Sequence, residues 1–291
     1  MSVADRVMIV GPGRVGLALG YALARADAVR SLVVCGRRPE PPAHPLFTEG
    51  VAEYVFGLTP PLPGTSAVFL AVPDDAVVEM AHAFAAQGPA PEGCAAFHLS
   101  GVLSTDVLAP LHVQGYAVGS FHPLQAIAHP VTGADRIPGS WFAVTGGPEA
   151  ASVARVLAAA LGCRTLDVPE SRRPLYHAAA VMASNFLPPL LDVACRLLER
   201  AGVPYDEALA ALVPLVRGTL ANIEEGGVEA AVTGPIPRGD LETISLHLRA
   251  LEPSERHLYT LLARRLARLA PGGVTESAVL ALAERYGTDV E

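Results

Sequence analysis

Short apolar runs alternate with longer helical segments through the first 168 residues of the chain. Runs of Val, Ile, Leu, Ala and Phe that are bounded by turn residues are typical of buried strands, and the segments between them are long enough for helices. Because strands that alternate with helices form parallel sheets, this pattern predicts an α/β domain with a mainly parallel sheet. The predicted strands cover residues 7–10, 32–35, 67–72, 95–98, 117–120, 141–145 and 164–168, and the helices between them include 15–25, 75–86 and 148–161.

After Pro169 the strand pattern stops and only helical periodicity remains. A long helix is expected over 175–201, with a kink or break at Pro188 and Pro189, because proline removes a backbone donor and clashes with the preceding turn. Further helices are expected over 205–212, 216–225, 241–250, 254–270 and 276–286. The sequence therefore predicts two domains, a Rossmann-type domain over 1–168 and an all-helical domain over 169–291.

A glycine-rich segment follows the first predicted strand and opens the first predicted helix. It reads Gly11-Pro12-Gly13-Arg14-Val15-Gly16. In this setting the first glycine makes a tight turn, the second admits a pyrophosphate, and the third lets the helix approach the strand, while the helix N-terminus binds the anion. We predict a dinucleotide site here, with a purely structural turn as the alternative.

The end of the second strand indicates which dinucleotide is bound. An acidic side chain there would hold the 2'-hydroxyl of NAD, but this chain has Arg37 and Arg38, with no carboxylate before Glu40. Two guanidinium groups suit a 2'-phosphate, so NADP is the expected cofactor, unless both arginines only solvate a surface loop. Val72 and Pro73 end another strand and are expected to line the cofactor path, and Asp74 or Asp75 is expected to cap the next helix.

Composition and charge narrow the function classes. The net charge of -8 removes any general attraction to nucleic acid. All 21 basic residues are arginine, so Schiff-base and P-loop chemistry, which require lysine, are excluded. No metal site is expected, because neither CxxC nor HExxH spacing occurs.

The N-terminus carries no export signal, so we expect a cytoplasmic protein. Apolar tracts such as 178–183 are interrupted before about 18 residues, so no membrane-spanning helix is expected.

Several motifs resemble the Rossmann-like proteins that carry a DUF2520 domain, within the 6-phosphogluconate-dehydrogenase-like superfamily. The matching segments are 98–101 (HLSG), 119–125 (GSFHPLQ), 176–180 (YHAAA) with Ser184-Asn185, and 233–240 (TGPIPRGD). The resemblance implies a dinucleotide domain, a helical domain that commonly supports dimerisation, and NADP-linked redox chemistry. Its relatives include pyrroline-5-carboxylate reductases, prephenate dehydrogenases, ketopantoate reductases and β-hydroxyacid dehydrogenases, of which the last two normally use a lysine that this chain lacks.

Without lysine, histidine is the expected proton donor for hydride transfer to a carbonyl or imine. His98 and His122 lie at or just beyond predicted strand ends, and His177 lies near the start of the first long C-terminal helix. Ser100 and His122 resemble the serine and the His-Pro histidine that prephenate dehydrogenases place near their nicotinamide. Each histidine has a structural hydrogen-bonding role as its alternative.

Two further polar residues are candidate substrate contacts. His177 and Ser184 are seven residues apart and should share a helix face, with Asn185 at its edge, where its amide needs a partner. Arg238 either grips a substrate carboxylate with Asp240 orienting it, or forms a structural pair with Asp240, which caps the next helix.

The leading hypothesis is an NADP-dependent oxidoreductase that acts on a small carboxylated oxo or imino compound in an interdomain cleft. Its expected catalytic residues are Ser100, His122, His177, Asn185 and Arg238. A homodimer through the helical domain is expected, without nucleic acid or membrane partners. The alternatives are a non-catalytic NADPH-binding sensor or scaffold, and an isomerase or lyase that uses a bound cofactor transiently.

Overall fold

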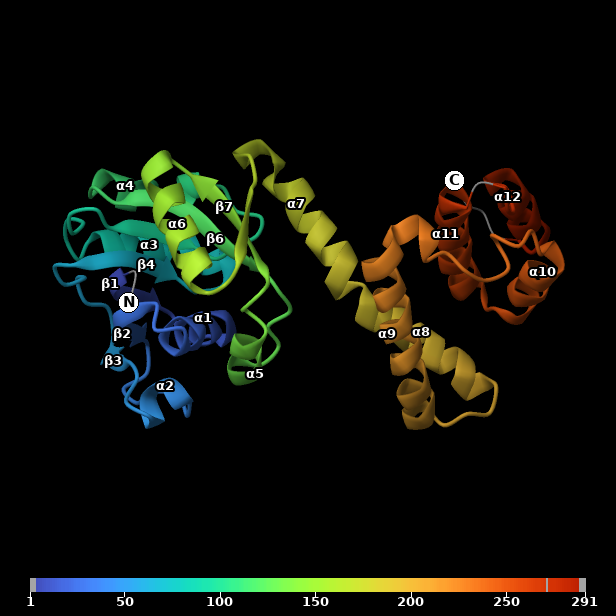
Figure 1. The fold of residues 1–291 in the computed structure, drawn as a ribbon, viewed down its shortest axis with the longest axis horizontal. Coiled ribbons are helices and arrows are strands. Elements are labelled where there is room, and N and C mark those ends of the chain that lie inside the picture. The colour runs from blue at the N-terminus through green and yellow to red at the C-terminus, as the bar shows by residue number, and fades with distance from the viewer. Residues whose placement is uncertain (1–3, 271, 288–291) are drawn as a thin grey trace. The chain divides into compact units, whose positions relative to one another are not determined.

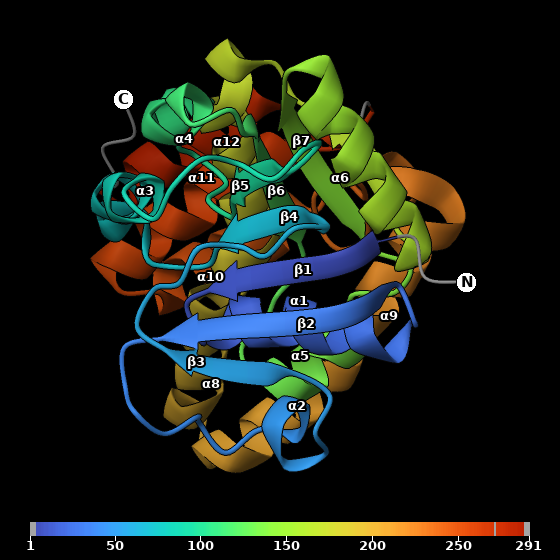
Figure 2. The same cartoon turned by 90° about the vertical axis from the view of Figure 1, so that its left-hand side faces the viewer.

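The computed structural model describes residues 4–270 and 272–287, and its first unit is built on one eight-stranded sheet (Figures 1 and 2). The strand order is β3-β2-β1-β4-β5-β6-β7-β8. Neighbouring strands are parallel except β6 and β7, which are antiparallel. The strands are β1 (Ala4–Val10), β2 (Val29–Gly36), β3 (Glu53–Phe56), β4 (Thr65–Leu70), β5 (Ala95–His98), β6 (Ala117–Leu124), β7 (Trp141–Gly146) and β8 (Arg164–Asp167).

All seven predicted strands are present, and β3 is an addition. Figure 2 shows β3, β2 and β1 lying side by side with their arrowheads at the same end. The prediction missed β3 because the four residues of this edge strand are exposed or half-buried and do not form a fully apolar run. The prediction ended the sixth strand at Ser120, whereas β6 continues to Leu124 and pairs with the antiparallel β7. His122 therefore lies within a strand.

Helices cover both faces of the sheet and each face has its own apolar core. One core joins the strands to α1 (Arg14–Arg25), α2 (Pro45–Thr48), α5 (Pro130–Asp135) and α6 (Pro148–Ala160). The other joins them to α3 (Val77–Ala85), η2 (Thr105–Leu108) and α4 (Ala109–Val113). Phe69, Phe97, Phe121 and Phe142 form a chain of ring contacts across the first core. Burial on both faces explains why the central strands read as continuous apolar runs.

A long helical run leads out of the sheet unit. It contains η3 (Glu170–Arg172), α7 (Arg173–Ala180), a π-helical turn (Val181–Asn185) and α8 (Leu187–Arg200). The irregularity is the π turn, which lies before the predicted position at Pro188 and Pro189, and both prolines lie in the first turn of α8.

The expectation that no helix is long and apolar enough to cross a membrane was wrong. The run Glu170–Arg200 has 31 residues and a mean hydropathy of 1.4 in its most apolar window, of which only 6% is buried. This finding concerns length and composition alone, which core helices of water-soluble proteins also satisfy.

Backbone contacts divide the chain into residues 1–185 and residues 186–291. The second unit contains α8, α9 (Tyr205–Ala230), α10 (Leu241–Ala250), α11 (Pro253–Leu269) and α12 (Glu276–Arg285). Two helices were predicted where α9 is continuous through Pro214, and its backbone breaks at Gly227, where φ is 79°. A small core formed by α10, α11 and α12 with Ile236 and Val274 stabilises this unit.

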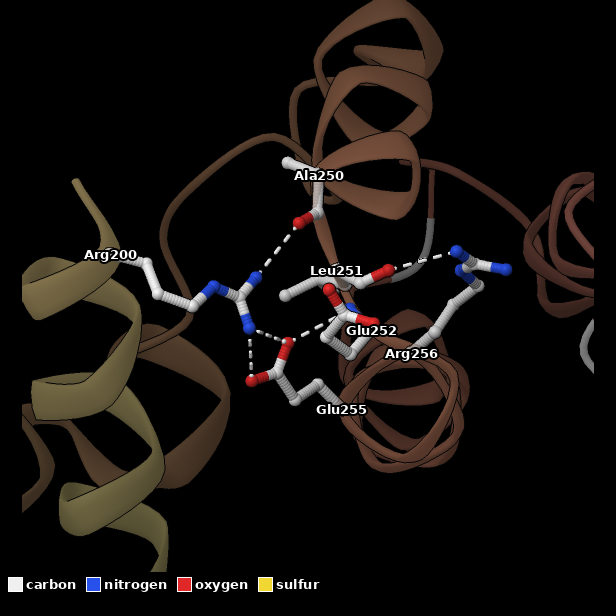
Figure 3. A network of polar contacts seen from close by, with 6 residues as sticks. All are labelled: Arg200, Ala250, Leu251, Glu252, Glu255 and Arg256. Carbon is white, nitrogen blue, oxygen red and sulfur yellow. Dashed lines mark hydrogen bonds and ion pairs between the residues drawn. The ribbon is translucent and has the colours of Figure 1, made fainter.

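A polar network links α8 to the α10–α11 corner (Figure 3). Arg200 Nη1 donates to both carboxylate oxygens of Glu255, at 2.7 and 2.9 Å, and Arg200 Nη2 donates to the Ala250 carbonyl at 3.0 Å. The same carboxylate accepts from the Glu252 backbone at 2.9 Å and closes a capping box at the start of α11. One arginine thus holds the end of α10 and the start of α11 together.

Candidate active site

The glycine loop has the geometry that a dinucleotide requires. Gly11 has a φ of +112°, and a Cβ there would lie 2.5 Å from the Ala71 carbonyl oxygen, so only glycine fits. A Cβ on Gly16 would lie 2.5 Å from the Gly11 carbonyl oxygen, so Gly16 lets α1 approach β1. Gly13 is exposed and is the N-cap residue of α1. The residues present therefore fit a bound pyrophosphate at the helix N-terminus.

Arg37 and Arg38 follow β2 on a loop that β3 holds in place. Tyr54 donates from its hydroxyl to the Arg38 carbonyl at 2.6 Å, and its ring lies where a Cβ on Gly36 would be. Both arginine side chains are exposed, and neither forms an ion pair with any residue in 4–270 or 272–287. The two guanidinium groups are therefore free for an anionic ligand.

The segment after β4 lies beside the glycine loop as predicted, but Asp74 does not have the predicted capping role. Val72 and Pro73 follow β4 beside the glycine loop, and Val72 Cγ1 would lie 3.2 Å from a Cβ on Gly11. Asp74 makes no side-chain cap on η1 (Asp74–Ala76). It accepts instead from the Ser100 hydroxyl at 2.7 Å, and that hydroxyl also accepts from the Val102 and Leu103 backbone at 3.2 and 3.1 Å. Asp74 thus fixes the loop after β5.

His98 is the last residue of β5 and is completely buried. Both ring nitrogens lack a hydrogen-bond partner of normal geometry among the described residues. Burial, and then the charge of Arg173, lower the pKa of His98 to about 3. A ring with no exposure and this pKa cannot deliver a proton to a ligand, so the structural role is the one that fits His98.

His122 and His177 converge on Gly101, which the sequence motif contained but did not single out. A Cβ on Gly101 would lie 2.5 Å from His177 Nδ1 and 3.0 Å from His122 Nε2, so any side chain there would displace the imidazoles. The two imidazole rings are 6.0 Å apart and nearly perpendicular. His177 Nδ1 is buried without a partner among the described residues. The structure therefore brings together two of the predicted catalytic histidines with the Ser100 loop.

Tyr176 is a site residue that sequence reasoning quoted only as part of a motif. Its hydroxyl lies 2.7 Å from His122 Nδ1, and the two rings meet edge to face. Burial lowers the pKa of His122 to about 4, with further lowering by His177 and Arg173. His122 is therefore a neutral imidazole at neutral pH, with Nδ1 engaged by the tyrosine.

Arg173 at the start of α7 is the second missed residue, and its side chain is fully buried. Its guanidinium donates to the Ser100 and Leu103 carbonyls and, at 2.9 Å, to the Thr145 hydroxyl. These contacts pin α7 to the loop after β5 and to β7. Arg172 is exposed, and nothing in the sequence distinguishes the two arginines.

The remaining predicted contacts are exposed. Ser184 and Asn185 lie in the π turn, whose wider hydrogen-bonding pattern breaks the α-helical spacing that was expected to place Ser184 below His177. The Asn185 amide faces solvent rather than an apolar helix surface, so it needs no protein partner. Arg238 is also exposed, and Asp240 caps α10 by accepting from the Thr243 backbone and hydroxyl at 3.0 and 2.7 Å.

Within the described residues, no three His, Cys, Asp or Glu side chains are grouped as a metal ion would require. The polar groups of the site are thus the Asp74–Ser100 pair, the His122–Tyr176 pair, His177 and the buried Arg173.

Comparisons with known proteins agree with this fold. A provisionally classed NADP oxidoreductase of Bacteroides fragilis is similar, with 25% identity, a TM-score of 0.68 and coverage of 91% of this chain and 98% of that one. The reductive aminase of Aspergillus terreus in complex with NADPH shares 20% identity, with a TM-score of 0.60 and coverage of 96% and 99%. The 1-pyrroline-5-carboxylate reductase of Streptococcus pyogenes shares 16% identity, with a TM-score of 0.59 and coverage of 97% and 98%.

These similarities confirm the predicted fold class, a Rossmann-type sheet followed by helices. A comparison with curated protein sequences finds no match. Residues 140–266 match the model of the family described as Domain of unknown function (DUF2520), which confirms the resemblance expected from the motifs. Residues 140–266 are therefore similar to the DUF2520 family, and the chain has a Rossmann-type fold followed by helices.

Proposed function

We propose that the protein is an NADP-dependent oxidoreductase. The observation that carries this proposal is that the candidate residues lie at the carboxyl ends of four parallel strands. They are the glycine loop after β1, the Asp74–Ser100 pair after β4 and β5, and His122 near the end of β6. Ligands of open α/β sheets bind at the carboxyl ends of the strands. The names of the similar proteins from Bacteroides fragilis and Aspergillus terreus, which include NADP and NADPH, support the same class.

The cofactor would be held by Gly11–Gly16 at its pyrophosphate and by Arg37 and Arg38 at its 2'-phosphate. NADPH, when bound, supplies the hydride. His122 would donate a hydrogen bond from Nε2 to the substrate oxygen or nitrogen, because its Nδ1 is engaged by Tyr176. Nε2 makes no hydrogen bond within the described part of the protein, so it is free for this contact.

The substrate class is a small oxo or imino compound, the groups that a hydride donor and an adjacent imidazole reduce. A substrate carboxylate held by Arg238, with Asn185 as a further contact, stays a prediction, as do the interdomain cleft and the cytoplasmic location. Arg173 is not available for that carboxylate, because its guanidinium is buried and bonded to backbone carbonyls.

A panel of oxo acids and cyclic imines tests the proposal. We expect NADPH consumption with at least one compound, and a loss of roughly 100-fold or more in His122→Gln, the usual effect of removing a general acid. His112→Gln on α4, outside the site, is the matched control and should retain wild-type turnover. Tight NADPH binding without turnover on any compound would contradict the enzyme and favour the sensor.

A second proposal concerns the oligomeric state, and we infer a homodimer through the helical segment. Large apolar side chains of α7, the π turn, α8 and α9 are exposed in a single chain, and clustered exposed apolar side chains are typical of protein interfaces. A membrane is a poorer explanation, because Arg173 and Tyr176 fix the first turns of the same run to the sheet unit. The exposed side chains are Leu175, Met182, Phe186, Leu190, Leu215 and Leu220, between 42% and 70% exposed.

Light scattering after gel filtration tests the dimer. Wild-type protein should have twice the chain mass of 30.2 kDa, and Leu215→Glu should shift the protein toward monomer. Val113→Glu is the control, since Val113 on α4 is 81% exposed but lies outside the helical segment. A monomeric wild type would refute this inference without affecting the proposed enzyme.

A further inference from the structure

The contact between Tyr176 and His122 raises the question of where the site obtains its proton. The two rings come from α7 and β6, 54 positions apart in sequence, and the hydroxyl lies 2.7 Å from Nδ1. A neutral imidazole has one N–H and one acceptor nitrogen. A Tyr176 hydroxyl that donates to Nδ1 leaves the proton of His122 on Nε2.

Nε2 is the ring nitrogen of His122 that lies next to Gly101. A Cβ at this position would lie 3.0 Å from Nε2 and 3.2 Å from Cε1, so the ring edge opposite Tyr176 lies against the one residue that has no side chain. Nε2 has no protein partner within 4–270 and 272–287, whereas Nδ1 has one. The imidazole therefore has one ring nitrogen in contact with the Tyr176 hydroxyl and one without a protein partner among the described residues.

Arg173 sets the charge balance of this pair. It is a buried cation whose donors are taken by neutral acceptors, the Ser100 and Leu103 carbonyls and the Thr145 hydroxyl. Burial, then His177 and then the charge of Arg173 lower the pKa of His122, so Arg173 adds to the cost of an imidazolium. The same charge opposes the burial that raises the pKa of Tyr176 to about 12, and so favours a tyrosinate. The cation thus penalises positive charge on His122 and stabilises negative charge on Tyr176.

We propose that Tyr176 supplies the proton of the reduction through His122, with Arg173 as the fixed counter-charge of the tyrosinate. This inference rests on the proposed function. As hydride reaches the substrate carbon, the Nε2–H bond breaks and a proton joins the substrate oxygen or nitrogen. At the same time the Tyr176 O–H bond breaks and a proton joins Nδ1. The histidine remains neutral throughout. Water later returns one proton to Nε2 while the Nδ1 proton moves back to the tyrosinate, which restores the starting state.

Tyr176 acts through His122 and is a positioning residue, whereas His122 touches the substrate. Of the other titratable groups, His177 on α7 and His98 on β5 interact electrostatically with His122, whereas Asp74 on η1 and Glu170 on η3 interact with Arg173. Asp74 and Glu170 lie near Arg173 and partly offset its charge, but Asp74 is engaged by Ser100 and Glu170 by Thr105. Neither carboxylate lies in hydrogen-bond contact with the pair.

Nitrogen NMR of histidine-labelled protein tests the geometry without any substrate. We expect His122 to be a neutral Nε2–H tautomer at pH 7, with an Nδ1 shift that moves in Tyr176→Phe and stays unchanged in Tyr116→Phe. Tyr116 is a matched control, because it is also buried but lies outside the site. An Nδ1–H tautomer in the wild type would overturn the relay, whether or not the protein oxidises NADPH.

The pH profile tests the chemistry with any substrate that the panel identifies. Wild-type turnover should be flat between pH 5 and 8, because neither relay group titrates there. In Tyr176→Phe the only donor left is the imidazolium, so turnover should fall roughly 100-fold at pH 7 and recover about tenfold per pH unit on acidification. Tyr176→Phe with the wild-type rate and profile would overturn the relay while leaving the oxidoreductase intact.

Discussion

The buried imidazole of His98 makes the sheet unit sensitive to acid, and His98→Phe should remove that sensitivity. Both nitrogens of His98 are buried without hydrogen-bond partners among the described residues, and burial lowers its pKa from 6.5 to about 3. The folded protein therefore keeps the ring neutral at pH values at which the unfolded chain protonates it. A phenyl ring has a similar volume, can fill the space of the imidazole and does not titrate.

The sign and size follow from this lowered pKa. Between pH 6.5 and 3 the unfolded state binds more protons than the folded state. The free energy of unfolding therefore has its full value above pH 6.5 and decreases as the pH falls toward 3. At pH 4.5 the loss attributable to His98 is roughly 2 to 3 kcal/mol, since each pKa unit corresponds to about 1.4 kcal/mol. Other groups, including His122, add to the total acid effect but are common to wild type and variant.

Urea unfolding followed by Trp141 fluorescence is the appropriate assay, because this single tryptophan lies in β7 and reports on the sheet unit. The difference in unfolding free energy between pH 7 and pH 4.5 should be smaller in His98→Phe by the 2 to 3 kcal/mol above. His82→Phe, on the exposed face of α3, should retain the wild-type difference. An unchanged pH dependence in His98→Phe would refute the assignment of a partnerless, neutral His98.

Three further substitutions follow from the structure. Gly101→Ala should lower turnover by about 100-fold with the fold retained by circular dichroism, since its Cβ displaces the imidazoles of His122 and His177; wild-type turnover would contradict their convergence. Arg37→Ala combined with Arg38→Ala should raise the KM for NADPH about tenfold or more relative to NADH, from the loss of charge-assisted hydrogen bonds; an unchanged ratio would exclude a 2'-phosphate contact. Glu255→Gln should cost at most about 1 kcal/mol in urea unfolding, because Arg200 is partly exposed; a larger loss would mean that the α8–α11 link is more than a surface ion pair.

The central strands and the glycine loop could be predicted because their causes are local. A strand buried on both faces must be apolar throughout, and Gly11 and Gly16 occupy positions where a Cβ has no room. The edge strand β3 has neither property, although its Tyr54 holds the loop of Arg38. The local sequence pattern therefore predicts segments that are buried in the core. It misses an edge strand such as β3, whose contribution to the site is a single hydrogen bond from Tyr54.

The residues around His122 could not be predicted, because their contacts join segments that are far apart in the sequence. Tyr176 stands next to His177 in the motif, but its partner is 54 positions away, and no periodicity links a helix start to the middle of a strand. Arg172 and Arg173 look alike in the sequence, and only the packing of α7 against β7 and the Ser100 loop buries one of them. The π turn likewise changed the expected face of Ser184, because its hydrogen-bond spacing has no signature in residue type.

The buried cation of the site is Arg173, and the chain has no lysine that could take its place. A buried lysine readily loses its proton and can serve as an acid, whereas a guanidinium stays charged even when burial lowers its pKa. The cation of this site is therefore permanent, and proton transfer has to use other groups. A permanent positive charge beside His122 also makes the imidazolium costly, so a histidine donor needs a second group that can accept the negative charge left behind. Tyr176 is the group in contact with His122 that can do so.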